Sequence, residues 1–255
     1  LELRSPIIAG SCGLTSDVEK MVEMEKAGVG AVVLKSIFEE QINEEISGVF
    51  KAGYGMGDAY PEAEDYIKAY IRSNTIQKYV ELVRNAKSRL TIPVIASVNC
   101  FSGGEWVSFA RQLEEAGADA LELNVFILPV NEFSAEVENV YFDIVKSIKS
   151  QVKIPVAVKI SHYFTNLSAF VDKIKAYGAN ATTLFNRFYE PDININTLEM
   201  GAASVFSTAA ELRTTLRWTG ILAGKDKRLE ISASTGVHGG EAAVKLLLAG
   251  ATTVQ

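Results

Sequence analysis

The sequence predicts an α/β fold, a (β/α)8 TIM barrel with long loops after strands 2 and 6. One joint recurs four times: a helix ends on glycine, a small residue follows and an apolar strand begins. Glycine suits the left-handed position that closes a helix. The joints lie at residues 25–31, 114–120, 176–181 and 248–251. Eight apolar segments alternate with helical patterns, and 255 residues is close to the size of one such barrel.

The eight expected strands are near-continuously apolar, as buried parallel strands are. Pro93 and Pro155 each open a strand, where a missing N–H does least harm. The strands are expected at 6–11, 31–36, 93–98, 120–125, 155–160, 181–186, 229–235 and 252–255.

Helical patterns fill the intervals between these strands. In the first, Thr15, Ser16 or Asp17 is the expected N-cap, and Met21 and Met24 share one face. The helices are expected at 17–27, 71–89, 105–116, 137–151, 167–177, 208–219 and 240–249.

Two connections are longer than simple loops, at 37–70 and 187–206. Both leave the carboxyl ends of strands, where insertions become lids and substrate walls. The alternative is a decorated loop with no role. Tyr54, Tyr60 and Tyr189 lie in these loops and are acid–base candidates.

Composition narrows the class of protein. The net charge of −6 gives no sign of a nucleic-acid surface. Cys12 and Cys100 are too few for a disulfide framework, and no signal peptide or membrane-spanning run is evident. We expect a cytoplasmic protein with no membrane partner. We also expect one domain over residues 1–255, incomplete at its C-terminus because the chain stops within a strand.

Polar residues end several of the predicted strands. Lys35 and Lys159 each close an apolar run, and Asn124 and Asn186 close two others. A buried ammonium is costly unless it meets an anion, so these residues indicate a site at the barrel mouth. The alternative is that each lysine reaches solvent from its strand end.

A turn of small residues follows the seventh strand. Ser234, Thr235 and Gly236 precede a helix start, the usual phosphate position in such barrels. The alternative is a plain N-cap turn. Across the ring, residues 9–13 are also small and would let a flat ring approach the backbone.

This set of residues, in this order, resembles the dihydroorotate dehydrogenase family of FMN-dependent barrels. The resemblance runs from about residue 6 to residue 255. The matching segments are Pro6-Ile7-Ile8-Ala9-Gly10-Ser11-Cys12-Gly13, Lys35-Ser36, Leu121-Glu122-Leu123-Asn124, Val158-Lys159-Ile160, Asn186, Ser234-Thr235-Gly236-Val237 and residues 249–255.

The resemblance implies roles for particular residues. It implies catalytic roles for Lys35, Asn124 and Lys159, with Lys159 at the flavin N1/O2 edge, where positive charge stabilises the reduced, anionic ring. Implied FMN contacts are Ala9, Gly10, Ser11, Lys35, Ser36, Ser97, Asn124, Lys159, Ser234, Thr235 and Gly236. Implied substrate contacts are Lys35, Asn124, Asn131, Asn186 and Arg187.

The sequence departs from the family at the catalytic base. Family members carry a cysteine or serine just after the asparagine that matches Asn124, whereas here neither occurs before Ser134. Cys12, Cys100 and His162 are substitute candidates, each with a structural alternative as a buried thiol or packed imidazole. His238, the other histidine, lies in the predicted phosphate turn, and no metal site is expected.

Three functions follow from these residues. The first is an FMN-dependent oxidoreductase that acts on a CH–CH group of a small planar or anionic substrate, with dihydroorotate as one candidate and pyrimidine biosynthesis as the setting. The second is a Schiff-base aldolase-type lyase that uses Lys159 or Lys35. The third is an FMN-binding barrel without turnover. Family members often form dimers, so the resemblance also points to a homodimer.

Overall fold

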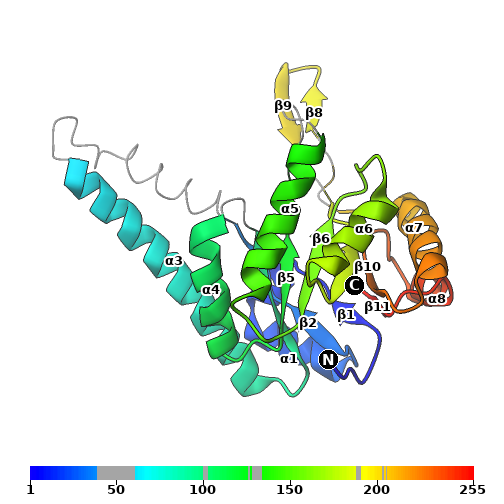
Figure 1. Cartoon of the computed structure of the whole chain (residues 1–255), viewed down its shortest axis with the longest axis horizontal. Coiled ribbons are helices and arrows are strands. Elements are labelled where there is room, and N and C mark those ends of the chain that lie inside the picture. The colour runs from blue at the N-terminus through cyan, green and yellow to red at the C-terminus, as the bar shows by residue number, and fades with distance from the viewer. Residues whose placement is uncertain are drawn as a thin grey trace.

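The computed structural model describes residues 1–38, 61–99, 103–125, 127, 134–187, 191–202, 204 and 206–255. Eight parallel strands form a nearly closed barrel, and helices surround it (Figure 1). Within the described part of the chain, no helix is long and apolar enough to cross a membrane.

The eight predicted strands are confirmed, and all of their mutual pairings are parallel. An isolated parallel bridge between Ile7 and Val254 brings the last strand back beside the first. Around the ring, the strands are β1 (Ile8–Ala9), β2 (Ala31–Val33), β4 (Val94–Asn99), β5 (Ala120–Asn124), β6 (Val156–Ile160), β7 (Ala181–Leu184), β10 (Glu230–Ala233) and β11 (Thr253–Val254).

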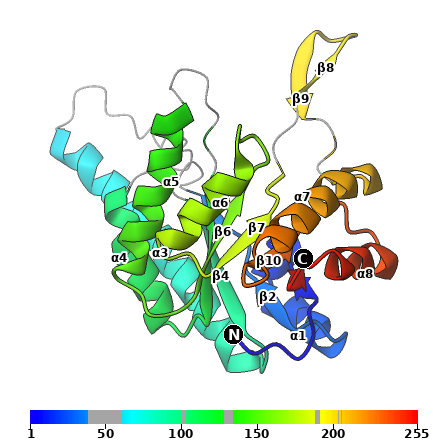
Figure 2. The same ribbon diagram turned by 45° about the vertical axis from the view of Figure 1, so that its right-hand side comes forward.

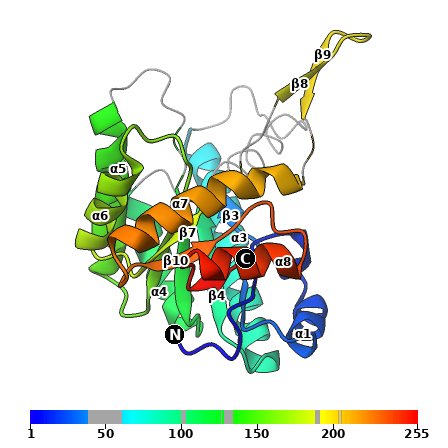
Figure 3. The ribbon, with the colours of Figure 1, turned by 90° about the vertical axis from the view of Figure 1, so that its right-hand side faces the viewer.

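The helices lie outside this ring (Figures 2 and 3). Asp17 is the N-cap of the first, because its carboxylate accepts a hydrogen bond from the Glu19 amide at 2.9 Å. The α-helices are α1 (Val18–Lys26), α3 (Pro61–Arg89), α4 (Gly103–Glu115), α5 (Ser134–Lys149), α6 (Leu167–Ala176), α7 (Leu212–Lys225) and α8 (Gly240–Leu248). Two short 3₁₀ helices precede α1 and α7: η1 (Gly13–Ser16) and η3 (Ala209–Glu211).

The repeated joint has the predicted backbone conformation. Gly28, Gly117, Gly178 and Gly250 have φ values of 102°, 100°, 110° and 107°. An L-residue with a Cβ is strained there, so glycine at this position is a requirement of the fold.

Three apolar clusters of described residues stabilise the barrel. The largest lies between strands and helices and includes Leu121, Leu123 and Phe170, all at most 2% exposed. A second lines the barrel interior near the strand starts and includes Ile8 and Ile95. A third packs α8 against β10 and β11 through Leu246, Ala233 and Val254.

Side chains along a strand alternate between its two faces. Because Leu121 and Leu123 face the helices, Glu122 and Asn124 point into the barrel.

The two long connections contain more structure than predicted. The 37–70 connection begins with a strand, β3 (Ile37–Phe38), that pairs with β4, and α3 already starts at Pro61. The 187–206 connection contains an antiparallel hairpin of β8 (Pro191–Asn194) and β9 (Glu199–Ala202), which projects from the barrel (Figure 2).

Helices α3 and α7 differ most from the bounds predicted from the sequence. Helix α3 was expected from residue 71, but proline at the first helical position is favourable, and Pro61 opens the helix. Helix α7 was expected to stop before Gly220, but it continues to Lys225 because Leu222 extends its buried face.

Candidate functional site

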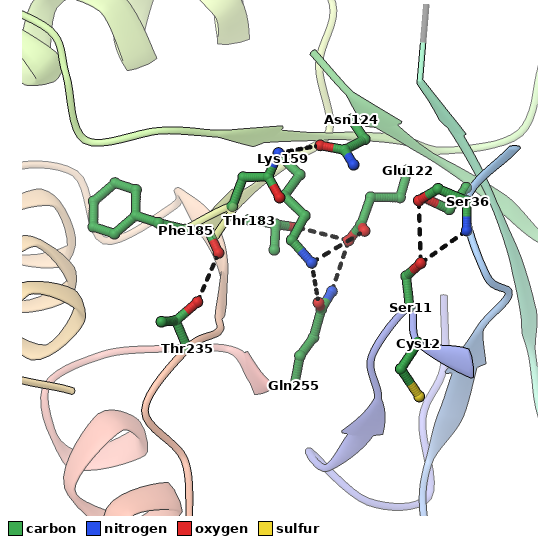
Figure 4. Close-up of polar contacts among 12 residues, drawn as sticks. Ser11, Cys12, Ser36, Glu122, Asn124, Lys159, Thr183, Phe185, Thr235 and Gln255 are labelled. Atoms are coloured by element: carbon green, nitrogen blue, oxygen red, sulfur yellow. Dashed lines mark hydrogen bonds and ion pairs between the residues drawn. The ribbon is translucent and has the colours of Figure 1, made fainter. Parts of the chain in front are cut away.

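A buried polar cluster lies inside the barrel around Glu122 (Figure 4). The Glu122 side chain points inward from β5, and the residue is 1% exposed. Its Oε2 accepts hydrogen bonds from Thr183 Oγ1 at 3.0 Å and Gln255 Nε2 at 2.7 Å. Its Oε1 lies 3.7 Å from Lys159 Nζ, and that ammonium donates to Gln255 Oε1 at 3.1 Å. Each charge is therefore compensated, as a buried charge requires.

The strand register sets the height of Lys159 in the barrel. Lys159 pairs with Asn124 on β5 and with Thr183 on β7. Lys159 is the penultimate residue of β6 and Asn124 is the last residue of β5, so both lie near the carboxyl ends of their strands. This is the face of a parallel barrel that carries chemistry.

Asn124 contacts the other predicted asparagine. Asn186 Nδ2 donates to Asn124 Oδ1 at 2.6 Å. Asn186 in turn is fixed by its backbone N–H, which donates to Ile160 O at 2.7 Å. The structure thus brings Asn124, Lys159 and Asn186 together at the mouth, on three adjacent strands or strand ends.

A chain of hydroxyls connects the ends of three other strands. Ser11 Oγ lies 3.1 Å from Ser36 Oγ, which lies 2.6 Å from Ser97 Oγ. The Tyr79 hydroxyl on α3 donates to Ser97 O at 2.8 Å and accepts from Ser97 N at 2.9 Å. Burial raises the pKa of Tyr79 above its ordinary value, so this phenol stays protonated. Three predicted flavin contacts, Ser11, Ser36 and Ser97, are therefore neighbours.

The turn after β10 has an unusual backbone. Thr235 and Gly236 have consecutive positive φ values of 80° and 77°. A Cβ on Gly236 would lie 2.3 Å from Leu212 N, so no larger residue fits. Thr235 Oγ1 donates to Phe185 O at 3.0 Å, which ties the turn to the end of β7 (Figure 4).

A small pocket adjoins this turn. Its volume is about 80 Å³, and its lining includes His162, Asn186, Arg187, Glu211 and Thr235. Burial raises the pKa of the Glu211 carboxyl, but the hydrogen bonds from Thr208 and from Arg187, which pairs with Glu211 at 3.0 Å, together lower that pKa below its ordinary value. Partial burial lowers the pKa of His162, so its imidazole is neutral at physiological pH.

Other predicted residues lie apart from this cluster or outside the described residues. Lys35 is an exposed residue beyond the end of β2. Cys12 is exposed, and its side chain points away from Glu122 (Figure 4). The predictions for Asn131, Cys100, Tyr54, Tyr60 and Tyr189 fall outside the described residues.

Sequence reasoning missed three residues of the site. The sequence places Glu122 and Gln255 in matching segments but predicts no role for either. Asn99, the last residue of β4, is 5% exposed, and its Oδ1 has no hydrogen-bond partner among the described residues. The sequence carries a signal for two of them, because Glu122 and Asn99 are polar residues in mostly apolar strands.

Comparison with known proteins finds relatives along the whole chain. Dihydroorotate dehydrogenase B (NAD(+)), catalytic subunit, of Thermoplasma acidophilum is 30% identical over 263 residues, spanning 100% of this chain and 83% of that protein. The same enzyme of Thermoplasma volcanium is 28% identical over 278 residues with equal coverage. Dihydroorotate dehydrogenase A (fumarate) of Limosilactobacillus reuteri is 27% identical over 267 residues, again covering 100% and 83%.

Among solved structures, "QR15, an Aldolase" matches with a TM-score of 0.61 at 15% identity. The match covers 100% of this chain and 90% of that one. At this identity the likeness shows the barrel fold alone. No protein-family model matches the chain.

Proposed function

The chain belongs to the dihydroorotate dehydrogenase family, and on that premise we propose that it is an FMN-dependent oxidoreductase acting on a CH–CH group of a small planar or anionic substrate. Dihydroorotate is the first candidate substrate. The observation that carries the proposal is the buried Lys159 ammonium beside the Asn124–Asn186 pair at the carboxyl ends of the strands. These groups offer a cation and amides to a planar, electron-accepting ring and its substrate.

The residues present fit FMN on two observations. The buried Asn99 Oδ1 at the mouth lacks a partner among the described residues, as expected of a ligand-facing group. The backbone at Thr235 and Gly236 forms a turn that admits no larger residue at Gly236, and such turns before a helix bind phosphate.

Separate groups of residues would hold the phosphate and the ring of FMN. Thr235 and Gly236 would hold the phosphate, and Lys159 would face the N1/O2 edge of the ring. When bound, FMN supplies the hydride acceptor. Further ring contacts are assigned to Ala9, Gly10, Ser11, Ser36, Ser97 and Ser234.

The substrate would lie against the asparagines. Asn124 and Asn186 share one hydrogen bond, and their remaining donors and acceptors would be available to a planar partner. Arg187 is engaged with Glu211 and with Ser204 O, and we assign it to shaping the pocket wall. Lys35 and Asn131 stay proposed substrate contacts.

We assign the proton acceptor to His162. It lines the pocket that Asn186 also lines, and its ring is covered in part by Tyr163 and Phe185, with centroids 4.2 and 5.7 Å away. A neutral imidazole can take a proton from a substrate carbon while the hydride leaves from the adjacent carbon. The loop after Asn124 needs no cysteine or serine in this scheme.

Schiff-base chemistry is the second candidate function. It needs a lysine with a free lone pair, and Lys159 instead lies in an ion pair with Glu122. That contact favours the oxidoreductase. A cytoplasmic location and a homodimer stay part of the proposal; size-exclusion chromatography with light scattering tests the dimer.

The visible spectrum of the purified protein tests the proposal, recorded before and after anaerobic addition of dihydroorotate. We expect a yellow protein that bleaches on addition. A yellow protein that keeps its colour would support FMN binding and would show that dihydroorotate is not the substrate. A colourless protein that takes up no added FMN would contradict the proposal, and borohydride trapping of a carbonyl substrate on Lys159 would then support the lyase.

A further inference from the structure

We propose that Glu122 is a positioning residue for Lys159: its buried carboxylate compensates the ammonium and holds it at the barrel mouth. The inference rests on the proposed function, because its consequence is the response of bound FMN to the Lys159 charge. Glu122 itself lies one layer below Lys159, since it pairs with Ala157, two residues before Lys159 on β6.

The hydrogen bonds around Glu122 leave one oxygen for the ammonium. Thr183 and Gln255 both donate to Oε2. Oε1 has no hydrogen-bond partner among the described residues, and it lies 3.7 Å from Lys159 Nζ. The carboxylate is thereby fixed by two neutral donors and directs its free oxygen toward the cation.

Gln255 bridges the two charges. Its Nε2 donates to Glu122, and its Oε1 accepts from Lys159. The opposite orientation of the amide would place N–H against the ammonium and C=O against the carboxylate. The amide is therefore oriented by the ion pair, and the three side chains form one unit.

Burial makes the anion necessary. Lys159 is 8% exposed and Glu122 is 1% exposed. A buried ammonium is costly unless an anion compensates it. Without Glu122, no anion would hold the Lys159 ammonium at this depth, and the positive charge that favours flavin reduction would be lost from the barrel mouth.

The first test needs no flavin. In urea unfolding of the flavin-free protein, Glu122→Gln and Lys159→Met each leave one buried charge without its partner, so each is expected to lower the unfolding midpoint. The double variant is expected to lose less stability than the two single losses together. The matched control is Ser232→Ala, a neutral interior position level with Thr183 on the neighbouring strand; combined with Lys159→Met it is expected to be additive. Additive losses for Glu122→Gln and Lys159→Met would overturn the proposal.

The second test measures the midpoint potential of bound FMN. The direction in which Glu122→Gln shifts this potential distinguishes the proposal from its alternative. If Glu122 were merely a nearby negative charge, Glu122→Gln would raise the potential. We expect it to lower the potential, as Lys159→Met does, with no further lowering in the double variant. A raised or unchanged potential would overturn the proposal.

If Glu122→Gln does not fold, Glu122→Asp takes its place, because it retains the negative charge on a side chain that is one methylene shorter. Glu122→Asp is expected to lower the FMN potential by less than Glu122→Gln would. An unchanged potential in Glu122→Asp would count against the proposal. If the protein binds no FMN, the proposed function fails, while the unfolding cycle still decides whether Glu122 and Lys159 are coupled.

Discussion

Single side chains at the barrel mouth define the reaction that this chain can support. Lys159 and Glu122 form a buried ion pair, and Asn124 and Asn186 share a hydrogen bond beside it. The resemblance to known barrels located Asn124, Lys159 and Asn186 from sequence, because each lies at or near the carboxyl end of a strand. It did not locate the partner of Lys159, because a contact between side chains on different strands depends on the register, which one sequence does not give.

Replacing His162 by asparagine tests the proposed proton acceptor. The rate of FMN reduction by dihydroorotate is expected to fall about 10²-fold or more, as for the loss of a general base, with FMN affinity unchanged. Stopped-flow absorbance measures the rate. His238→Asn, an exposed histidine in the turn after β10, is the control and is expected to retain the wild-type rate. A wild-type rate in His162→Asn would place the base elsewhere.

The pH profile of the wild-type rate provides a second test of His162. Burial lowers the pKa of His162 from the ordinary value of 6.5. The imidazole acts as a base only when neutral, so the rate is expected to hold from alkaline pH down through 6.5 and to decline only in more acidic solution. The neighbouring ionisable groups in the pocket are Tyr163, Arg187 and Glu211. An acid limb above 6.5 would contradict the assignment.

At the scale of elements, the turn between β10 and α8 carries the most constrained backbone near the site. Sequence reasoning found this turn because small residues follow a buried strand. It missed the start of α3, although proline followed by acidic residues at 61–65 is a helix-start signal. It also missed the β8–β9 hairpin, because β8 is exposed along its whole length and lacks the buried apolar run of the barrel strands. It missed β3 because its two residues are followed directly by the acidic Glu39 and Glu40.

Substituting alanine for Gly236 is expected to destabilise this turn. The positive φ of 77° alone costs roughly 1–3 kcal/mol for a residue with a Cβ, and the contact with Leu212 N adds to it. Urea unfolding and FMN titration measure the two effects, a lower midpoint and a weaker affinity. Gly239→Ala is the control, because that residue is extended and nothing lies within 4 Å of an added Cβ. Equal effects of the two substitutions would refute the explanation.

At the scale of the whole molecule, the described strands form a ring whose weakest pairing, here called the seam, joins the first and last strands. Its eight strands were predictable, because each is a buried apolar run bounded by turns. The sequence did not predict how many residues pair between the first and last strands, and that pairing closes the ring. That pairing is the single bridge between Ile7 and Val254, whereas β4, β5 and β6 pair over four residues each.

Hydrogen exchange is expected to reveal this seam. Amides in residues 7–10 and 252–255 should exchange faster than those in β4, β5 and β6, because fewer ladder hydrogen bonds must open to expose them. Exchange followed by mass spectrometry measures the difference. Equal protection around the ring would show that the seam is as stable as the rest.

The contacts of Arg187 at the base of the 187–206 insertion bear on how this part of the barrel can change during evolution. Arg187 pairs with Glu211 and donates to Ser204 O, so the insertion leaves and rejoins the barrel at one fixed point. The hairpin beyond that point pairs with itself, and Ile195 and Leu198 at its tip are 82% and 83% exposed. Selection can therefore lengthen, shorten or replace this module without moving the ring.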